Sequence, residues 1–222
     1  MDTGKHGTAE HAHTTAWIAS VLRSRIAAGE LTPGSKLSEQ SLSASLGVSR
    51  NTLRQAFTIL AGESIVTHIP NRGVFVASPG EEEVREIYRI RRTIEPAAVL
   101  WGELTPQTLD EMEAIVQRAQ AARNAGSVTD MADANQALHR AVVGLTGSAT
   151  LQELMDRVLA EMRLVFHAMA SAPDFHSHYV ERNVELVKRL RAGEREEAAT
   201  GLRAYLDAAE AELLGHLAGT GH

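Results

Sequence analysis

Residues 45–60, "SLGVSRNTLRQAFTIL", place an apolar stripe of side chains beside a polar cluster. The apolar positions recur three, four and seven residues after Leu53, which is the spacing of one face of an α-helix. Ser49 precedes this stripe and is of a residue type that caps helix N-termini. The spacing therefore predicts a helix whose buried face carries Leu53, Ala56, Phe57 and Leu60 and whose other face begins with Arg50, Asn51, Thr52 and Arg54.

The flanking sequence predicts a small domain around this helix. Apolar residues at helical spacing predict a helix over 14–28, and the stretch "GELTPGSKL" after it reads as a turn. Ser38 can cap a second short helix that ends at Gly47. Two β-rich runs, 65–69 and 74–77, are joined by Pro70-Asn71-Arg72-Gly73 and predict a hairpin with a basic tip. Together these elements predict a winged helix-turn-helix domain over 14–77.

The polar start of the central helix suits DNA. In this fold the N-terminal residues of the second, recognition helix meet base edges in the major groove. Arginine there can pair with guanine, and hydroxyl groups such as those of Ser49 and Thr52 suit phosphate oxygens. Arg72 at the hairpin tip would reach the backbone or the minor groove. The alternative is a small helical domain whose polar face is only solvated.

Charge and composition limit the classes of partner. The net charge is −6, yet residues 1–77 carry seven Lys/Arg against five Asp/Glu, so only this third has a positive balance. Cysteine is absent, which excludes disulfides and thiolate metal sites. No apolar run approaches the ~18 residues of a membrane span, and no signal peptide is apparent, so we expect a cytoplasmic protein with no membrane partner. Residues 1–13 are polar and aperiodic and are expected to form a flexible tail.

The sequence pattern after residue 77 predicts helices only, so the protein as a whole is expected to be mainly α. Ser78, Pro79 and Gly80 interrupt regular structure, so 78–82 reads as a linker and hinge. Beyond it, helical patterns cover about 81–104, 108–124, 128–146, 149–171, 176–192 and 194–217. They predict an all-helical antiparallel bundle over 83–218. His176 and His178 are expected in a loop, facing solvent.

The N-terminal third resembles the GntR family of bacterial transcription regulators. The resemblance rests on "AGELTPGSKLSEQSL", "LGVSRNTLRQAFTIL" and "PNRGVFVA", between Ile18 and Ala77. It implies double-stranded DNA as the partner. Gln40 stands where relatives often have arginine, so the contact there is expected to differ. The residues at the family's DNA-contacting positions are Gln40, Ser49, Arg50, Asn51, Thr52, Arg54, Asn71, Arg72 and Gly73.

The C-terminal part resembles the all-helical effector domain of the FadR/FCD-type subfamily, through "EIYRIRRTIEPAAV" and "GEREEAATGLRAYLDAA". Many members hold a divalent metal with one Asp and three His. Three of these four positions are altered here, so we expect no metal or other cofactor, with His139 as the one remaining ligand type. The positions would hydrogen-bond a small effector instead, with Arg91 meeting a carboxylate; Glu95 is the alternative partner of Arg91. The candidate effector-binding residues are Arg91, Asn135, His139, Asn183, Tyr205 and Arg163, and His167 lies four residues after Arg163 on the same predicted helix.

These features favour a ligand-responsive transcription regulator that binds a near-palindromic operator as a homodimer, with a small organic acid as effector. Three alternatives stay open: a metal-responsive regulator, a DNA-binding protein whose bundle only dimerises, and a metal-dependent hydrolase. The hydrolase is disfavoured, because the ten histidines form no HExxH stretch and no nucleophile elbow is present. We therefore expect a protein that is not an enzyme.

Overall fold

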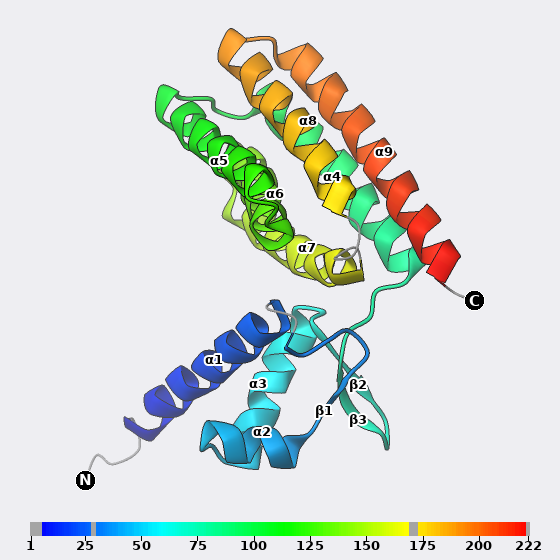
Figure 1. The fold of residues 1–222 in the computed structure, drawn as a ribbon. Coiled ribbons are helices and arrows are strands. Elements are labelled where there is room, and N and C mark those ends of the chain that lie inside the picture. The colour runs from blue at the N-terminus through cyan, green and yellow to red at the C-terminus, as the bar shows by residue number, and fades with distance from the viewer. Residues whose placement is uncertain (1–5, 28–29, 169–172, 221–222) are drawn as a thin grey trace. The chain divides into compact units, whose positions relative to one another are not determined.

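The computed structural model of the protein describes residues 6–27, 30–168 and 173–220, with side chains for 15–26, 30–166 and 176–218. The chain divides into two compact units, Met1–Ser78 and Pro79–His222. This boundary lies within the segment expected to be a linker. The elements of the first unit are α1 (His6–Ala27), β1 (Lys36–Leu37), α2 (Glu39–Leu46), α3 (Arg50–Gly62), β2 (Val66–Ile69) and β3 (Gly73–Val76) (Figure 1).

Helix α3 is the centre of the first unit. Its predicted stripe is buried, and it packs against α1 and α2. The side chain of Ser49 accepts a hydrogen bond from the backbone N–H of Thr52 at 3.1 Å, which caps the helix as expected. Ser38 caps α2 in the same way, and Gly47 ends α2 in the left-handed conformation that glycine adopts most easily.

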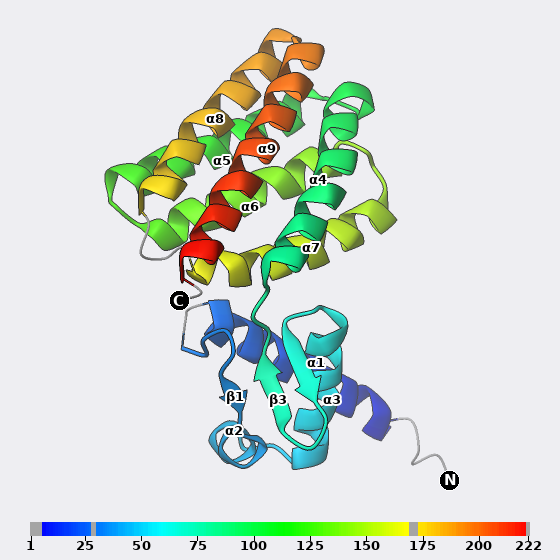
Figure 2. The same ribbon diagram turned by 90° about the vertical axis from the view of Figure 1, so that its right-hand side faces the viewer.

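The wing is a three-stranded antiparallel sheet in the order β1-β3-β2 (Figure 2). The hairpin of β2 and β3 agrees with the sequence prediction to within a residue. Strand β1 was missed, because the sequence predicted only a turn there. A strand of two residues is too short to show alternation, so its pairing of Lys36 with Phe75 is a tertiary feature.

Helix α1 begins at His6 and so extends into the segment expected to be an irregular tail. Its buried residues, Ile18, Leu22 and Ile26, anchor the helix to the core. Ala9, Glu10 and Ala12 are good helix formers, and extending an anchored helix adds one hydrogen bond per residue without a new nucleus. The polar, aperiodic sequence therefore led to a predicted helix that begins too late.

The second unit contains only helices among its described residues, as predicted. Thr105 caps α5 with Pro106 in its first turn, and Glu83 accepts from the backbone N–H of Gly80 before α4. The helix bounds agree with the predicted runs to within a few residues. They are α4 (Glu81–Trp101), α5 (Pro106–Asn124), α6 (Val128–Gly144), α7 (Ala149–Ala168), α8 (Pro173–Ala192) and α9 (Arg195–Thr220).

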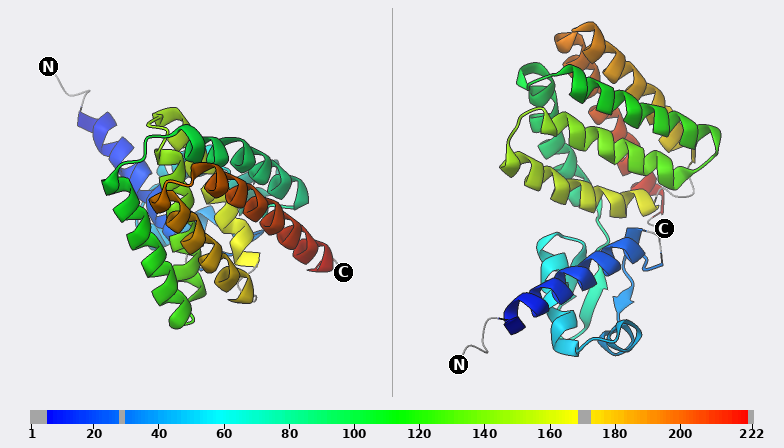
Figure 3. Two further views of the ribbon diagram at one scale, coloured as in Figure 1. Left: turned by 90° about the horizontal axis from the view of Figure 1, so that it is seen from above. Right: turned by 90° about the vertical axis from the view of Figure 1, so that its left-hand side faces the viewer.

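The bundle is arranged around one buried core. Helix α4 runs along α9, and α6 lies against α4, α5, α7 and α8 (Figure 3). The core joins residues from all six helices, among them Tyr88, Met112, Leu138, Met162, Leu190 and Leu206. None of the helices within the described ranges is long and apolar enough to cross a membrane.

The expectation that His176 and His178 lie in a loop was wrong, and so was the expected exposure of His176. Both belong to α8, which begins at Pro173, since proline is tolerated in the first turn of a helix. His178 is exposed as expected, but His176 is buried, with 5% of its surface accessible. Its ring meets Phe166 of α7 edge to face at 5.2 Å.

Candidate nucleic-acid interface and effector site

The start of α3 presents a polar surface to solvent. Arg50, Asn51 and Arg54 are exposed, and Thr52 is half-buried. The hydroxyl groups of Ser49 and Thr52 lie 2.7 Å apart, so the cap fixes both beside the first free backbone N–H groups of the helix. This end of a helix favours negative charge, because its N–H groups are unpaired and its dipole is positive there.

Arg54 is held by a residue that the sequence did not single out. Its Nε donates to both carboxylate oxygens of Glu39 at 3.0 Å, and its Nη2 lies 2.9 Å from Oε2. This ion pair between α2 and α3 occupies one edge of the guanidinium. The other edge remains available for a base. The two residues are 15 positions apart, so no local spacing indicates the pair.

The wing tip is shaped by backbone conformation. Asn71 has φ +61° and Gly73 has φ +111°. Both values lie in the region that glycine and asparagine tolerate best. At Gly73 a Cβ atom would also come within 3.2 Å of Cε of Lys36. A larger residue at 73 would therefore be strained by its φ and would push the end of the Lys36 side chain aside.

Two basic side chains flank one aromatic ring on this sheet. The Arg72 guanidinium carbon lies 5.7 Å from the centre of the Phe75 ring, and Nζ of Lys36 lies 6.0 Å from it. Such cation–π contacts orient long side chains at a modest gain in free energy. Lys36 joins Arg72 as a candidate phosphate contact, although the sequence pattern identified only Arg72.

We expect Lys36→Ala and Arg72→Ala each to weaken DNA binding about equally for all sequences. Removing one phosphate-binding side chain should lower the slope of log K against log salt by ~0.9. Fluorescence anisotropy with operator and random duplexes at several salt concentrations measures both quantities. Arg203→Ala, at an exposed basic position of α9, serves as the control and should leave the slope unchanged. A weakening confined to the operator would contradict the assignment.

Most of the candidate effector residues meet in one buried hydrogen-bonded network. Arg91 Nε donates to Glu95 Oε1 at 2.6 Å, and Glu95 Oε2 lies 2.6 Å from Nδ1 of His139. The Tyr205 hydroxyl lies 2.9 Å from Nε2 of His139 and 2.9 Å from Oδ1 of Asn135. Asn183 Nδ2 donates to that same oxygen at 2.7 Å. We call this set the polar network: Arg91, Glu95, Asn135, His139, Asn183 and Tyr205.

The charges in the polar network balance. Burial disfavours the Glu95 carboxylate, but Arg91 and His139 outweigh it and hold the pKa of Glu95 below its usual value. Burial lowers the pKa of His139, although Glu95 opposes this, so the imidazole is neutral near pH 7. Burial also opposes the charge of Arg91, but Glu95 overcomes it and keeps the guanidinium protonated. The polar network therefore carries one positive charge, on Arg91, and one negative charge, on Glu95.

The residues of the polar network do not fit a divalent metal. A metal needs donor lone pairs that converge on one point, whereas both His139 nitrogens lie within hydrogen-bond distance of protein groups. Neutral amides and a phenol are weak ligands for transition metals. Over the described parts of the chain, no cluster of three or more His, Cys, Asp or Glu residues is placed to hold an ion.

Two polar atoms of the network are buried without a partner among the described residues. They are Nη2 of Arg91, a donor, and Oδ1 of Asn183, an acceptor. Buried groups of this kind are rare, since each costs free energy unless water or a ligand satisfies it. The network therefore retains hydrogen-bonding capacity.

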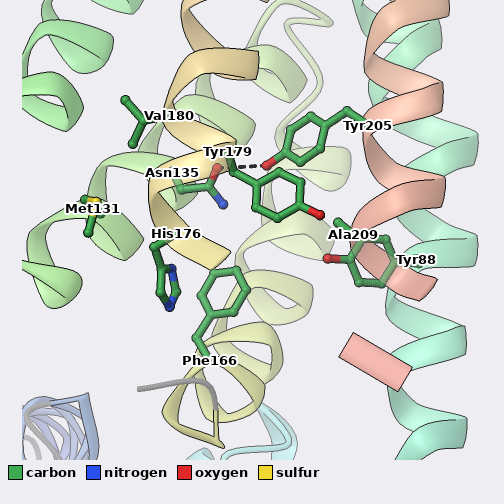
Figure 4. Close-up of a pocket in the computed structure, with 9 residues that line it drawn as sticks. All are labelled: Tyr88, Met131, Asn135, Phe166, His176, Tyr179, Val180, Tyr205 and Ala209. Atoms are coloured by element: carbon green, nitrogen blue, oxygen red, sulfur yellow. Dashed lines mark hydrogen bonds between the residues drawn. The ribbon is translucent and has the colours of Figure 1, made fainter. Parts of the chain in front are cut away.

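A small cavity adjoins the network through Asn135 and Tyr205 (Figure 4). It measures about 10 Å³, roughly the room for one water molecule. Tyr179 stacks on Tyr205 with ring centres 4.9 Å apart, so aromatic faces form much of its wall. The lining comes from five helices and comprises Tyr88, Met131, Asn135, Phe166, His176, Tyr179, Val180, Tyr205 and Ala209.

The sequence identified most residues of the polar network as candidates, but only Asn135 and Tyr205 among those that line the cavity. Arg163 was expected to join the polar network, but it forms an ion pair with Asp133 instead. The side chain of His167 lies outside the described ones. The pairing of Arg91 with Glu95, foreseen only as an alternative, is the one observed. Tyr88, Phe166 and Tyr179 were missed as cavity residues, because aromatic positions in a helical pattern do not differ from ordinary core.

Burial of His176 predicts a specific loss of stability in acid. Burial lowers its pKa from 6.5 to about 4, so between these values the unfolded chain binds a proton that the folded chain does not. The stabilisation is present above pH 6.5 and is lost as the pH falls toward 4. We expect His176→Gln to flatten this decline. Urea unfolding of both proteins at pH 7, 5.5 and 4.5 measures the difference, and parallel declines would contradict the assignment.

The fold and the two sites define the class. A capped helix with an exposed polar start, a basic wing and a separate helical unit constitute a winged helix-turn-helix DNA-binding protein with a second domain. Residues 14–76 match the family model "Bacterial regulatory proteins, gntR family", and residues 86–208 match that of the FCD domain. The chain belongs to the GntR family of bacterial transcription regulators and carries an FCD domain.

Individual proteins that are similar to this chain are also transcription regulators. The HTH-type transcriptional regulator McbR of Escherichia coli (strain K12) is 25% identical over 194 residues, covering 86% of this chain and 88% of McbR. A solved structure from Rhodococcus sp. RHA1, described as a GntR transcriptional regulator, is 40% identical with a TM-score of 0.85, covering 90% of this chain and 97% of that one. The structure of E. coli McbR/YncC shares the fold, with a TM-score of 0.78 at 24% identity and coverage of 91% and 97%. These are regulators, not enzymes.

Proposed function

We propose that this regulator acts as a homodimer in the cytoplasm on a near-palindromic operator. The observation that carries the proposal is the exposed polar start of α3, where Arg50 and Arg54 stand beside the Ser49 cap. A two-fold dimer brings two such helices to successive faces of the major groove, so the operator repeats the same half-site in inverted order.

The second part of the proposal is a small-molecule effector in the helical domain, which changes operator affinity. It is supported by the cavity beside the polar network and by the unsatisfied atoms of Arg91 and Asn183. An effector acts only through different affinities for two arrangements of the protein, and we propose Ser78–Gly80 as the hinge between them.

The chemistry of the effector depends on Arg91. An organic acid was expected because a free guanidinium would meet its carboxylate. Since Glu95 already accepts from Arg91 at 2.6 Å, that reason is weakened. We propose further that the site works without a metal ion, because three of the family's four ligand positions hold Asn135, Asn183 and Tyr205.

Selection of bound sequences from a random DNA pool tests the first part. We expect the enriched sequences to contain two inverted half-sites, and sedimentation equilibrium to show two chains per duplex. Enrichment of a single asymmetric site by one chain would contradict the dimer. Absence of any enrichment would contradict operator recognition itself.

A further inference from the structure

The interior of the helical domain is electrically balanced without a ligand. Arg91 and Glu95 are almost fully buried, with 1% and 0% of their side chains exposed, and they neutralise each other. His139 continues the network as a neutral group. A carboxylate ligand placed beside them would be a second buried anion with no cation left to pair with it.

The cavity wall is uncharged as well. Burial raises the pKa of Tyr88 to about 12 and lowers that of His176 to about 4. Burial also raises the pKa values of Tyr179 and Tyr205. Each titratable group that lines the cavity is therefore neutral near pH 7. A carboxylate behind the wall, that of Glu212, accepts from the Tyr179 hydroxyl at 2.8 Å and adds negative charge, not positive.

The polar groups on the wall are suited to a hydrogen-bonding partner. Oδ1 of Asn135 is occupied by Tyr205 and Asn183, whereas its amide nitrogen points toward the space among the rings and has no acceptor among the described residues (Figure 4). Phe166 and Tyr179 line the same cavity (Figure 4). A single hydrogen-bond donor beside aromatic side chains suits a flat molecule that carries an acceptor at its edge.

We propose that the helical domain binds an uncharged, flat effector that carries at least one hydrogen-bond acceptor, such as an aromatic amide, and binds it without a metal ion. The inference rests on the proposed effector-responsive function and specifies the chemistry of its site.

The size of the cavity supplies a link to regulation. A space of about 10 Å³ cannot hold an aromatic amide, so binding must enlarge it. The lining comes from α4, α6, α7, α8 and α9, and close-packed helices yield by shifting against one another rather than by compression. Ligand binding therefore selects a packing of the bundle that differs from the one in this structure.

Matched pairs of ligands that differ only in charge test the proposal. The full-length protein is titrated by calorimetry, and its melting temperature is followed, with benzamide and benzoate, phenylacetamide and phenylacetate, and zinc chloride alone. We expect at least one amide to bind and raise the melting temperature, its acid partner to bind at least tenfold more weakly, and zinc to show no stoichiometric binding.

Two variants localise the effect. Asn135→Asp keeps the shape but replaces the amide donor by a carboxylate, so amide binding should fall at least tenfold. Arg203→Ala, on the exposed surface of α9, should bind like the wild type. Asn135→Asp, Asn183→His and Tyr205→His together restore one Asp and three His with His139. This triple variant should gain one zinc per chain and so validates the metal assay.

The outcomes separate this inference from the proposed function. Tighter binding of an acid than of its amide, lost in Asn135→Asp, would overturn the uncharged effector and leave the effector-responsive function standing. Stoichiometric zinc binding by the wild type that disappears in His139→Asn would overturn the metal-free site. If none of these compounds binds while DNA binding is intact, the inference fails, whereas the operator-binding part of the proposed function still stands.

Discussion

Replacing Arg50 and Arg54 together by alanine should remove the preference for operator over random DNA while the fold stays intact. Both side chains are exposed at the start of α3, so their loss creates no cavity. Each arginine–guanine pair discriminates by about 1–3 kcal/mol, so the double variant should lose roughly 30-fold to 10⁴-fold in specificity. Competition binding with operator and scrambled duplexes measures the ratio, and circular dichroism checks the fold.

The single variant Glu39→Ala serves as a graded control. It removes the carboxylate that orients the Arg54 guanidinium but leaves both arginines in place. We expect a smaller loss of specificity than in the double variant, with little change in stability, because exposed ion pairs contribute about 0–1 kcal/mol. Discrimination at the wild-type level in the Arg50/Arg54 variant would refute the recognition-helix assignment.

In the first unit, local signals were enough to predict most of the fold. The caps at Ser38 and Ser49, the stop at Gly47 and the apolar stripe of α3 each depend on residues within one or two helical turns. The features that were missed depend on contacts distant in sequence. Strand β1 exists because it pairs with β3, and the Arg54–Glu39 contact spans two helices.

In the helical unit, the resemblance to the FCD-type effector domain predicted most members of the polar network, but it did not predict their protonation or their neighbours. Asn135 and His139 lie one helical turn apart, so their shared face follows from the period. The pairing of Arg91 with Glu95 also follows from their spacing of four residues on α4, whereas the contact of Glu95 with His139 depends on how closely α4 and α6 pack, which is not visible in the sequence. His176 was expected in a loop because it stands at the very start of the predicted helical run, whereas α8 begins three residues earlier, at Pro173.

The second large effect concerns the stability of the bundle. Arg91→Ala looks like a direct test of effector response, but in the structure it would leave Glu95 as a buried carboxylate without its cation. Breaking a buried ion pair by removing one partner costs about 3–5 kcal/mol. We therefore expect Arg91→Ala, and equally Glu95→Ala, to destabilise the helical domain by this amount. Urea unfolding followed by circular dichroism measures it.

The double variant Arg91→Met/Glu95→Leu separates the cost of an unpaired charge from the value of the pair itself. Apolar side chains of similar volume that replace a buried pair are often neutral or stabilising by about 1–4 kcal/mol, so most of the lost stability should return. The exposed pair Arg85 and Glu81, also four residues apart on α4, is the matched control, and Arg85→Ala should cost less than about 1 kcal/mol. A double variant as unstable as either single one would mean that the polar network is needed for folding through the hydrogen bond of Glu95 to His139. In that case the effector site could not be changed at Arg91 or Glu95 without losing the domain, and Asn135 would be the position at which binding is separable from stability.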